Sequence, residues 1–242
     1  MGTRDGYPFG TFCWVDLATG DAGAAKRFYG ELLGWSAPDG ERYAHAVLEG
    51  RDVAGVYAVD GVEPHWTSYV AVDDADAVAA KVPELGGTVL EPPFDAGDEG
   101  RRAVVADPVG ARFALWQAAT HPGAGLVNDV GAWCSNQLVA PDVEPAVPFY
   151  RGLLGWEVEP EGDSYWSVRN AGGDNGGMLA SPGPPGWLVY FHVADTDVAA
   201  ASAESLGASV LLAPETIGLG RIAVLADPQG AAFGVFAGAT DP

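Results

Sequence analysis

Residues 12–35, FCWVDLATGDAGAAKRFYGELLGW, are matched by residues 133–156, WCSNQLVAPDVEPAVPFYRGLLGW. Residue 12 aligns with residue 133, an offset of 121, and both stretches carry the dipeptide Phe-Tyr and the run Leu-Leu-Gly-Trp at the same places. Self-similarity at a fixed offset is the sequence sign of repeated structural units. The chain therefore consists of two homologous halves, and we expect two similar domains related by an approximate twofold axis.

The repeat extends beyond these stretches. Trp66 and Trp187 keep the offset of 121, whereas the Asp-Pro pairs that begin at Asp107 and Asp227 differ by 120, which indicates a one-residue deletion in the preceding loop. Between the halves, a proline and two glycines are typical of a connection. We predict a first domain over residues 1–118, a linker over residues 119–129 and a second domain over residues 130–242.

Each half divides again into two units with the order strand, helix and three strands. In the first unit a strand over residues 11–18 precedes a helix, which Asp21 caps and whose apolar residues recur at intervals of three or four. Residues 67–117 repeat this order. Three strands are predicted after the first helix, near residues 35–38, 42–49 and 53–59. Four such βαβββ units predict an α+β fold.

The amino-acid composition argues against nucleic acids and membranes as binding partners. The chain has 12 basic and 33 acidic residues, a formal net charge of −21, and such a field repels nucleic acids and anionic membrane surfaces. No apolar run reaches the roughly 18 residues that a membrane-spanning helix needs. Two cysteines are too few for a disulfide framework, so we expect a cytoplasmic protein. We expect the chain to be either a monomer, in which the two halves form an internal pseudo-dimer, or a homodimer.

Two motifs carry a resemblance to a known family. The pattern D-x-x-x-A-x-x-F-Y-x-x-L-L-G-W follows the first strand of each half, and D-P-x-G precedes each last strand. With four βαβββ units, the chain resembles the vicinal oxygen chelate superfamily, which includes glyoxalase I, extradiol dioxygenases and bleomycin-binding proteins, and in particular its tandem glyoxalase-like members. The resemblance implies two glyoxalase-like domains with cupped mixed sheets, each sheet enclosing a ligand cavity.

The same resemblance implies positions for a divalent metal held by His, Gln and Glu. None of the corresponding residues in this sequence is of those types: they are Trp14, Thr67 and Ala114 in the first half, and Ser135, Leu188 and Gly234 in the second. We therefore expect no bound transition metal and no cofactor. His65 and His121 are interpreted as solvated or core histidines, whereas strand alternation turns His192 toward the cavity.

Strand alternation also predicts which side chains line the cavities. The first set is rich in aromatic rings, and Asp16 and Arg112 are its charged members; the second set is neutral. The alternative is that these rings fill the barrels as core. The first set comprises Phe12, Trp14, Asp16, Thr67, Tyr69, Arg112 and Trp116, and the second comprises Trp133, Gln137, Tyr190 and His192.

Four functions are compatible with such cavities. The first is a metal-independent binding protein that sequesters or carries a small aromatic, possibly cationic, natural product, with the first-half cavity as the binding site. The second is a metal-independent enzyme acting on a natural-product intermediate, in which Asp16 serves as acid or base and Arg112 holds an anionic oxygen. The third is a metal-dependent lyase or dioxygenase, which the missing metal ligands disfavour. The fourth is a degenerate member of the fold that serves only as a structural partner.

Overall fold

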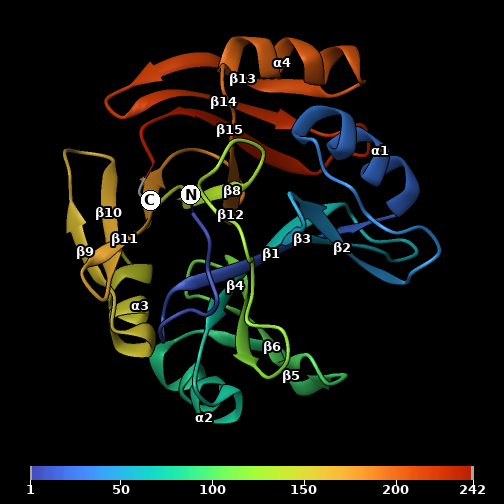
Figure 1. Cartoon of the computed structure of the whole chain (residues 1–242). Coiled ribbons are helices and arrows are strands. Elements are labelled where there is room, and N and C mark those ends of the chain that lie inside the picture. Colours follow the sequence, from blue (N-terminus) through green and yellow to red (C-terminus); the bar gives the residue numbers. More distant parts are fainter. Residues whose placement is uncertain (1, 241–242) are drawn as a thin grey trace.

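The computed structural model describes residues 2–240, so the outer limits of the two predicted domains, residues 1 and 242, lie outside the described residues. Two mixed sheets, one from each half, make up the molecule (Figure 1). This confirms the expected α+β fold of two glyoxalase-like domains. Within the described residues, no helix is both long enough and apolar enough to cross a membrane.

The described residues of the first domain form seven strands and three helices. They are β1 (Phe12–Thr19), α1 (Ala22–Leu33), β2 (Tyr43–Leu48), β3 (Arg51–Ala58), β4 (His65–Ala71), α2 (Ala75–Lys81), the 3₁₀ helix η1 (Pro83–Leu85), β5 (Thr88–Ala96), β6 (Gly100–Ala106) and β7 (Arg112–Ala118).

In the second domain, the part of the chain up to residue 240 forms eight strands and two helices. They are β8 (Trp133–Ala140), α3 (Ala146–Leu154), β9 (Glu157–Pro160), β10 (Tyr165–Asn170), β11 (Gly173–Ala180), β12 (Gly186–His192), α4 (Thr196–Ser205), β13 (Ser209–Ile217), β14 (Gly220–Ala226) and β15 (Ala232–Gly238).

Each sheet joins the two βαβββ units of one half. The strand order is β2-β3-β1-β4-β7-β6-β5 in the first domain and β13-β14-β15-β12-β8-β11-β10-β9 in the second. The first strands of the two units pair antiparallel, β1 with β4 and β8 with β12, whereas β1 pairs parallel with β3 and β4 with β7. The first unit therefore shares its sheet with the second unit and not with a unit of the other half.

Local sequence signals account for the helix limits. The Asp21 carboxylate accepts the backbone N–H of Ala24 at 2.9 Å and caps α1, which ends at Gly34 with a left-handed φ of 80°. A side chain is strained at such a φ, so glycine suits this end. Asp74 caps α2 in the same way. The α-helix ends before Pro83, which cannot supply the next backbone N–H.

One predicted strand is absent from the first domain. Residues 35–38 do not form a strand, and only an isolated bridge joins Ser36 to Val47 there. Pro38 lacks a backbone N–H and Gly40 has a φ of 80°, so the chain turns away from the sheet at this point. The corresponding stretch of the second domain lacks this turn and pairs with β10 as β9.

The two sequence motifs meet across the domain interface. Tyr29 of α1 donates its hydroxyl to the Asp227 carboxylate at 3.1 Å, and Tyr150 of α3 donates to Asp107 at 2.9 Å. Both tyrosines and both aspartates are buried. The Phe-Tyr pair of each helix thus contacts the Asp-Pro turn of the other domain, so the shared motifs hold the two domains together.

The tryptophans that end the motifs add a second symmetric pair of contacts. The indole of Trp35 donates to the carbonyl of Gly131 at 2.7 Å, and that of Trp156 donates to the carbonyl of Gly10 at 2.6 Å. Helix α1 also packs beside α4, and α3 beside η1. Helices α1 and α3 therefore take part in the contact between the domains, and the concave face of each sheet is the place to look for a site.

Candidate functional site

The concave face of the first domain gathers a buried carboxyl and several rings. Trp14 is opposite Tyr69, and Asp16 is opposite Thr67, in the antiparallel pair β1–β4, so these four side chains share one face as expected. Asp16 is fully buried. Its Oδ2 accepts the hydroxyl of Tyr69 at 2.5 Å and that of Tyr43 at 3.2 Å.

The guanidinium that faces this carboxyl comes from Arg102 and not from Arg112. Arg112 stands at the first position of β7, opposite Ala106 at the end of β6, and its side chain is exposed. Arg102 is paired with Trp116 further along the strand, and its guanidinium lies 5.4 Å from the Tyr69 ring centroid. Strand alternation correctly puts Arg112 on the same face of the sheet as Trp116. Arg112 is nevertheless exposed to solvent, because it is the first residue of β7.

Burial dominates the electrostatics of Asp16. It raises the pKa of this carboxyl above its ordinary value of 3.8, although Arg102 and the two tyrosine hydroxyls lower it in part. Oδ1 of Asp16 is buried and has no hydrogen-bond partner among residues 2–240. The carboxyl is therefore a buried acid with one free oxygen.

Asp16→Asn is expected to gain stability relative to the wild type as the pH rises above about 4. A carboxyl whose pKa is raised by folding contributes stability that is present below its unfolded pKa and is lost as the pH rises through its folded pKa. The amide does not titrate, so the difference in unfolding free energy should move toward the variant between pH 4 and pH 7. Urea unfolding of both proteins across this range measures it, and a difference that stays constant or moves the other way contradicts the expectation.

The rings of the first domain are packed against one another. Trp14 is 2% exposed, Tyr69 2% and Trp116 5%. The indole of Trp14 donates to the hydroxyl of Tyr43 at 2.8 Å, and that of Trp116 donates to the carbonyl of His121 at 3.0 Å. The side chains expected to line a first-half cavity thus fill much of the space between them.

A bulge removes Phe12 from the expected lining of the first domain. The pairing of β1 with β4 shifts between Phe12 and Trp14, and the ring of Phe12 packs at the domain interface, 5.3 Å from Trp156 and 4.9 Å from Trp187. The pairing of β8 with β12 shifts in the same way between Trp133 and Ser135, and Trp133 is buried there with its indole donating to the carbonyl of Ser135 at 3.1 Å. An extra residue in a strand reverses the alternation beyond it, and the sequence pattern does not show this.

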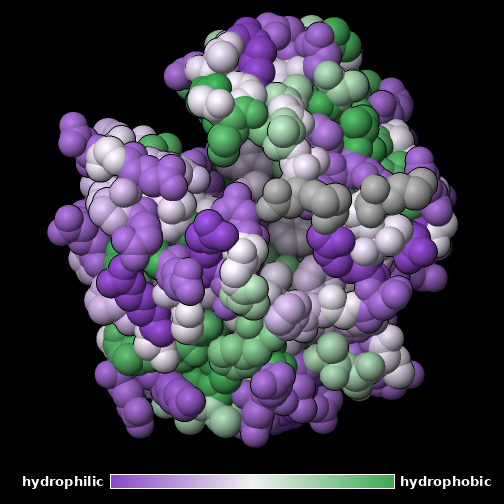
Figure 2. All heavy atoms as spheres, turned by 60° about the vertical axis from the view of Figure 1, so that its left-hand side comes forward, coloured by the Kyte–Doolittle hydropathy of each residue, from purple (hydrophilic) through white to green (hydrophobic). Residues whose placement is uncertain are grey.

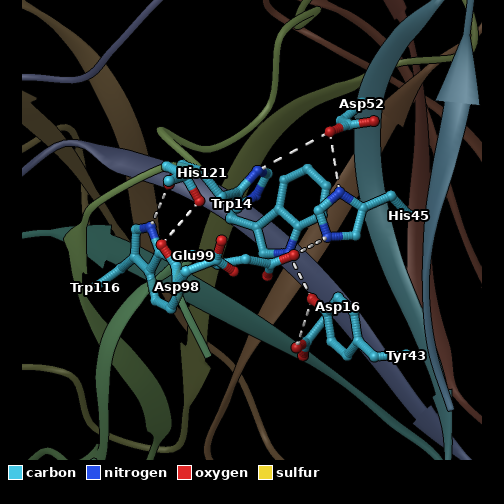
Figure 3. A network of polar contacts seen from close by, with 10 residues as sticks. Trp14, Asp16, Tyr43, His45, Asp52, Asp98, Glu99, Trp116 and His121 are labelled. Atoms are coloured by element: carbon cyan, nitrogen blue, oxygen red, sulfur yellow. Dashed lines mark hydrogen bonds and ion pairs between the residues drawn. The ribbon is translucent and has the colours of Figure 1, made fainter. Parts of the chain in front are cut away.

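Two histidines and an aspartate converge beside Trp14 (Figure 3). Nδ1 of His45 lies 2.9 Å from Oδ2 of Asp52, and Nδ1 of His121 lies 4.0 Å from the same oxygen. The Trp14 ring centroid is 5.4 Å from that of His45 and 4.5 Å from that of His121. Burial, together with the neighbouring His45, lowers the pKa of His121 to about 4, so its imidazole is neutral near pH 7.

Sequence reasoning missed this cluster. It interpreted His121 as a solvated or core residue, and its burial agrees with the second alternative. It did not foresee that the connection between the domains runs back over the first domain and brings the imidazole to His45 and Asp52. The backbone N–H of Ala124 donates to the carbonyl of Cys13, and that of Gly125 donates to the carbonyl of Asp52. No spacing in the sequence could have shown that the connection takes this path.

The concave face of the second domain is more open. Ser135, Gln137 and His192 are all partly exposed there, in contrast to the buried set of the first domain. The face lies between β9–β11 and β13–β15 in Figure 1, and Figure 2 shows the surface hollowed between two lobes. The hydroxyl of Tyr190 donates to Oε1 of Gln137 at 3.0 Å, and Nδ1 of His192 lies 2.8 Å from the carbonyl of Asn128.

Smaller and neutral side chains explain this difference. In the equivalent registers, Ser135 replaces Trp14, Gln137 replaces Asp16 and Ile222 replaces Arg102. The second face therefore loses both charges and the largest ring. What remains is a neutral surface with aromatic and apolar walls, which is typical of sites for small organic ligands.

The metal positions that the resemblance implied do not hold metal ligands in the structure. Asp16 shares the first face with Trp14 and Thr67, and its carboxylate already accepts two tyrosine hydroxyls. In the second domain a side chain in place of Gly234 would put its Cβ 2.2 Å from the ring of Tyr190, so there is no room for a donor there. These positions therefore do not fit a metal of the type that the resemblance implied. They are Trp14, Thr67, Ala114, Ser135, Leu188 and Gly234.

Comparisons with known proteins agree with this fold. Residues 11–115 match the model of the Glyoxalase/Bleomycin resistance protein/Dioxygenase superfamily, and residues 135–236 match that of a glyoxalase-like domain. The chain belongs to this superfamily. It is 42% identical to "Putative glyoxylase CFP32" of Mycobacterium tuberculosis, with 97% of each chain covered.

Two further relatives bear on function and fold. The chain is 34% identical to the anthracycline biosynthesis protein DnrV of Streptomyces peucetius, covering 93% of this chain and 92% of that protein. The Mn(II)-bound glyoxalase of Novosphingobium aromaticivorans superposes with a TM-score of 0.70 at 21% identity, covering 95% of this chain and 82% of the other. At that identity the superposition supports the fold alone.

Proposed function

We propose that this superfamily member binds a flat, polyketide-like aromatic molecule on the concave face of its second domain, in a carrier or sequestering role. The observation that carries the proposal is the open, neutral face around Ser135, Gln137 and Tyr190, opposite in character to the packed face of the first domain. The relation to a protein named for anthracycline biosynthesis supports the ligand class. The proposal keeps the ligand class expected from the sequence and moves its site to the second domain.

The polar groups of this face suit a ligand that carries hydroxyl and carbonyl groups. Tyr190 and Gln137 are joined by a hydrogen bond, and both retain further donor and acceptor capacity. Nδ1 of His192 donates to a backbone carbonyl, which leaves Nε2 as an acceptor. The net charge of −21 favours a ligand with a basic group, such as an amino sugar.

A fluorescence titration tests the proposal. An anthracycline glycoside is titrated with the wild type, Gln137→Ala and Asp16→Asn, which are altered at equivalent positions of the two domains. We expect saturable binding to the wild type, weakened about 10-fold by Gln137→Ala and unchanged by Asp16→Asn. Loss of binding in Asp16→Asn alone would place the ligand in the first domain, and no binding to the wild type would remove the proposal.

Chelation is expected to leave this binding unchanged. The second-domain face offers no ligand set at the positions that the resemblance assigns to a metal, so aromatic contacts and hydrogen bonds alone hold the molecule. The same titration after dialysis against EDTA should give the same affinity within about 2-fold. A marked fall that is restored by adding a divalent ion would contradict the proposed mode of binding.

A second candidate function is catalysis at Asp16. The specific observation is a fully buried carboxyl with a raised pKa and a free Oδ1, held by two tyrosine hydroxyls. A carboxyl whose pKa is raised by burial holds its proton more firmly than an exposed one and can act as a general acid or base. Incubation with polyketide intermediates followed by product analysis separates the two candidates: a product formed by the wild type and not by Asp16→Asn favours catalysis.

A further inference from the structure

We propose that His45, Asp52 and His121 form a binding site for one first-row divalent metal ion, such as Zn²⁺ or Co²⁺, in the first domain. This site uses none of the residues at the positions that the resemblance implied, although it lies beside Trp14, and it belongs to the first domain and not to the ligand face of the second. It also departs from the expectation, drawn from the sequence, that the protein holds no metal. Two imidazoles and one carboxylate are a common ligand set for such ions.

The distances suit a shared ion. One ligand atom from each of the three residues lies within 4.8 Å of the other two. Nδ1 of His45 and Nδ1 of His121 lie 2.9 and 4.0 Å from Oδ2 of Asp52. Because metal–nitrogen and metal–oxygen bonds are about 2.0–2.2 Å, ligand atoms on one ion lie roughly 3–4 Å apart. Small side-chain rotations would therefore bring all three onto an ion.

The environment of the histidines points to the same assignment. Nε2 of His45 and Nε2 of His121 are both buried without a hydrogen-bond partner in the described part of the chain. Binding of an ion through Nδ1 leaves the proton of each imidazole on Nε2, so Nε2 of His45 becomes a buried donor that needs an acceptor. Nε2 of His45 also lies 3.4 Å from a carboxylate oxygen of Glu99. A carboxylate behind a ligating imidazole is the usual partner that orients it toward a metal.

The backbone holds the three residues in place. His45 lies on β2 and Asp52 on the adjacent β3, in the hairpin that pairs these strands. His121 lies on the connection that follows β7, which is tied to the first domain by the hydrogen bonds of Ala124 and Gly125 and by the hydroxyl of Tyr7, 2.6 Å from the carbonyl of Ala124. A site assembled from separate, anchored elements needs little reorganisation to bind an ion.

The second domain does not repeat the cluster. His45 is paired with Gly55 on β3, and the equivalent pair in the second domain is Ser167 with Gly177. A serine therefore stands where the first domain has its histidine ligand. The proposal therefore requires one ion per chain, although the protein has two similar domains. This stoichiometry also distinguishes a built site from diffuse binding to the acidic surface.

The test is a titration of untagged, chelator-treated protein with Co²⁺ and with Zn²⁺. Calorimetry gives the stoichiometry and affinity, and visible absorption of Co²⁺ reports nitrogen ligation. The Trp14 ring lies 4.5 Å from that of His121, so Co²⁺ should also quench its fluorescence. We expect one ion per chain, with affinity weakened at least 10-fold in Asp52→Asn and in His121→Gln, and about 10-fold in Glu99→Gln.

The matched control is His65→Gln, which removes a histidine of the same domain that lies outside the cluster. It should leave the affinity unchanged. Asp52 is partly exposed, so Asp52→Asn is expected to fold even if a His121 variant does not, and circular dichroism checks both. Absence of saturable Co²⁺ binding to the wild type, or binding that Asp52→Asn and His65→Gln affect equally, would overturn the proposal. Neither outcome bears on ligand binding in the second domain.

Discussion

Ser135→Trp should lower the affinity of the second domain for an aromatic ligand by about 100-fold, a loss of roughly 2.7 kcal/mol. Position 135 is the register equivalent of Trp14, and both pair with a tyrosine of the neighbouring strand. In the first domain the indole at this position is buried against neighbouring rings. The same ring in the second domain would occupy the space that the ligand needs. The fluorescence titration with an anthracycline glycoside measures the change.

Two control variants make this result specific. Ser135→Ala keeps the face open and should retain affinity within about 3-fold, because it removes at most one hydroxyl contact. Trp14→Phe changes the equivalent position of the first domain and should have no effect on the ligand. Unchanged affinity in Ser135→Trp, in a protein that is folded by circular dichroism, would exclude the second-domain face as the site.

Tyr29→Phe and Tyr150→Phe should each lower the free energy of unfolding by about 1.5–3 kcal/mol. Each hydroxyl donates to a buried aspartate of the other domain and accepts an indole N–H, from Trp66 at 3.1 Å and from Trp187 at 2.8 Å respectively. Replacement by phenylalanine leaves an aspartate oxygen and an indole N–H buried without this partner. The cost of such unpaired groups explains the size of the expected effect.

The double variant is expected to lose the sum of the two single effects, because the two sites share no partner. Urea unfolding followed by tryptophan fluorescence measures all three. Tyr165→Phe alters a partly exposed ring outside the domain interface and should change the free energy by less than about 0.5 kcal/mol. Losses below 0.5 kcal/mol in both single variants would show that the motifs do not stabilise the interface through these hydroxyls.

The sequence by itself determined the repeat, the order of elements apart from the strand predicted at residues 35–38, and the family fold. Asp21, Asp74, Gly34 and Pro83 act on the backbone within a few residues of themselves, so the limits of α1 and α2 follow from local chemistry. Alternation along β1 correctly placed Trp14 and Asp16 on one face with Thr67 and Tyr69. The motif itself could be recognised, but its role in joining the domains could not, because each contact spans more than 40 residues.

Only the tertiary structure decided which groups meet. Arg102 and Arg112 lie on the same face of the sheet. Strand register places Arg102 in the middle of this face and Arg112 at its end, so Arg102 is the arginine that interacts with Asp16. A bulge of one residue turned Phe12 to the domain interface. The path of the connection brought His121 to His45 and Asp52, residues about 70 positions earlier in the chain. Register, bulges and loop paths are settled by packing over the whole molecule, and for that reason local patterns do not contain them.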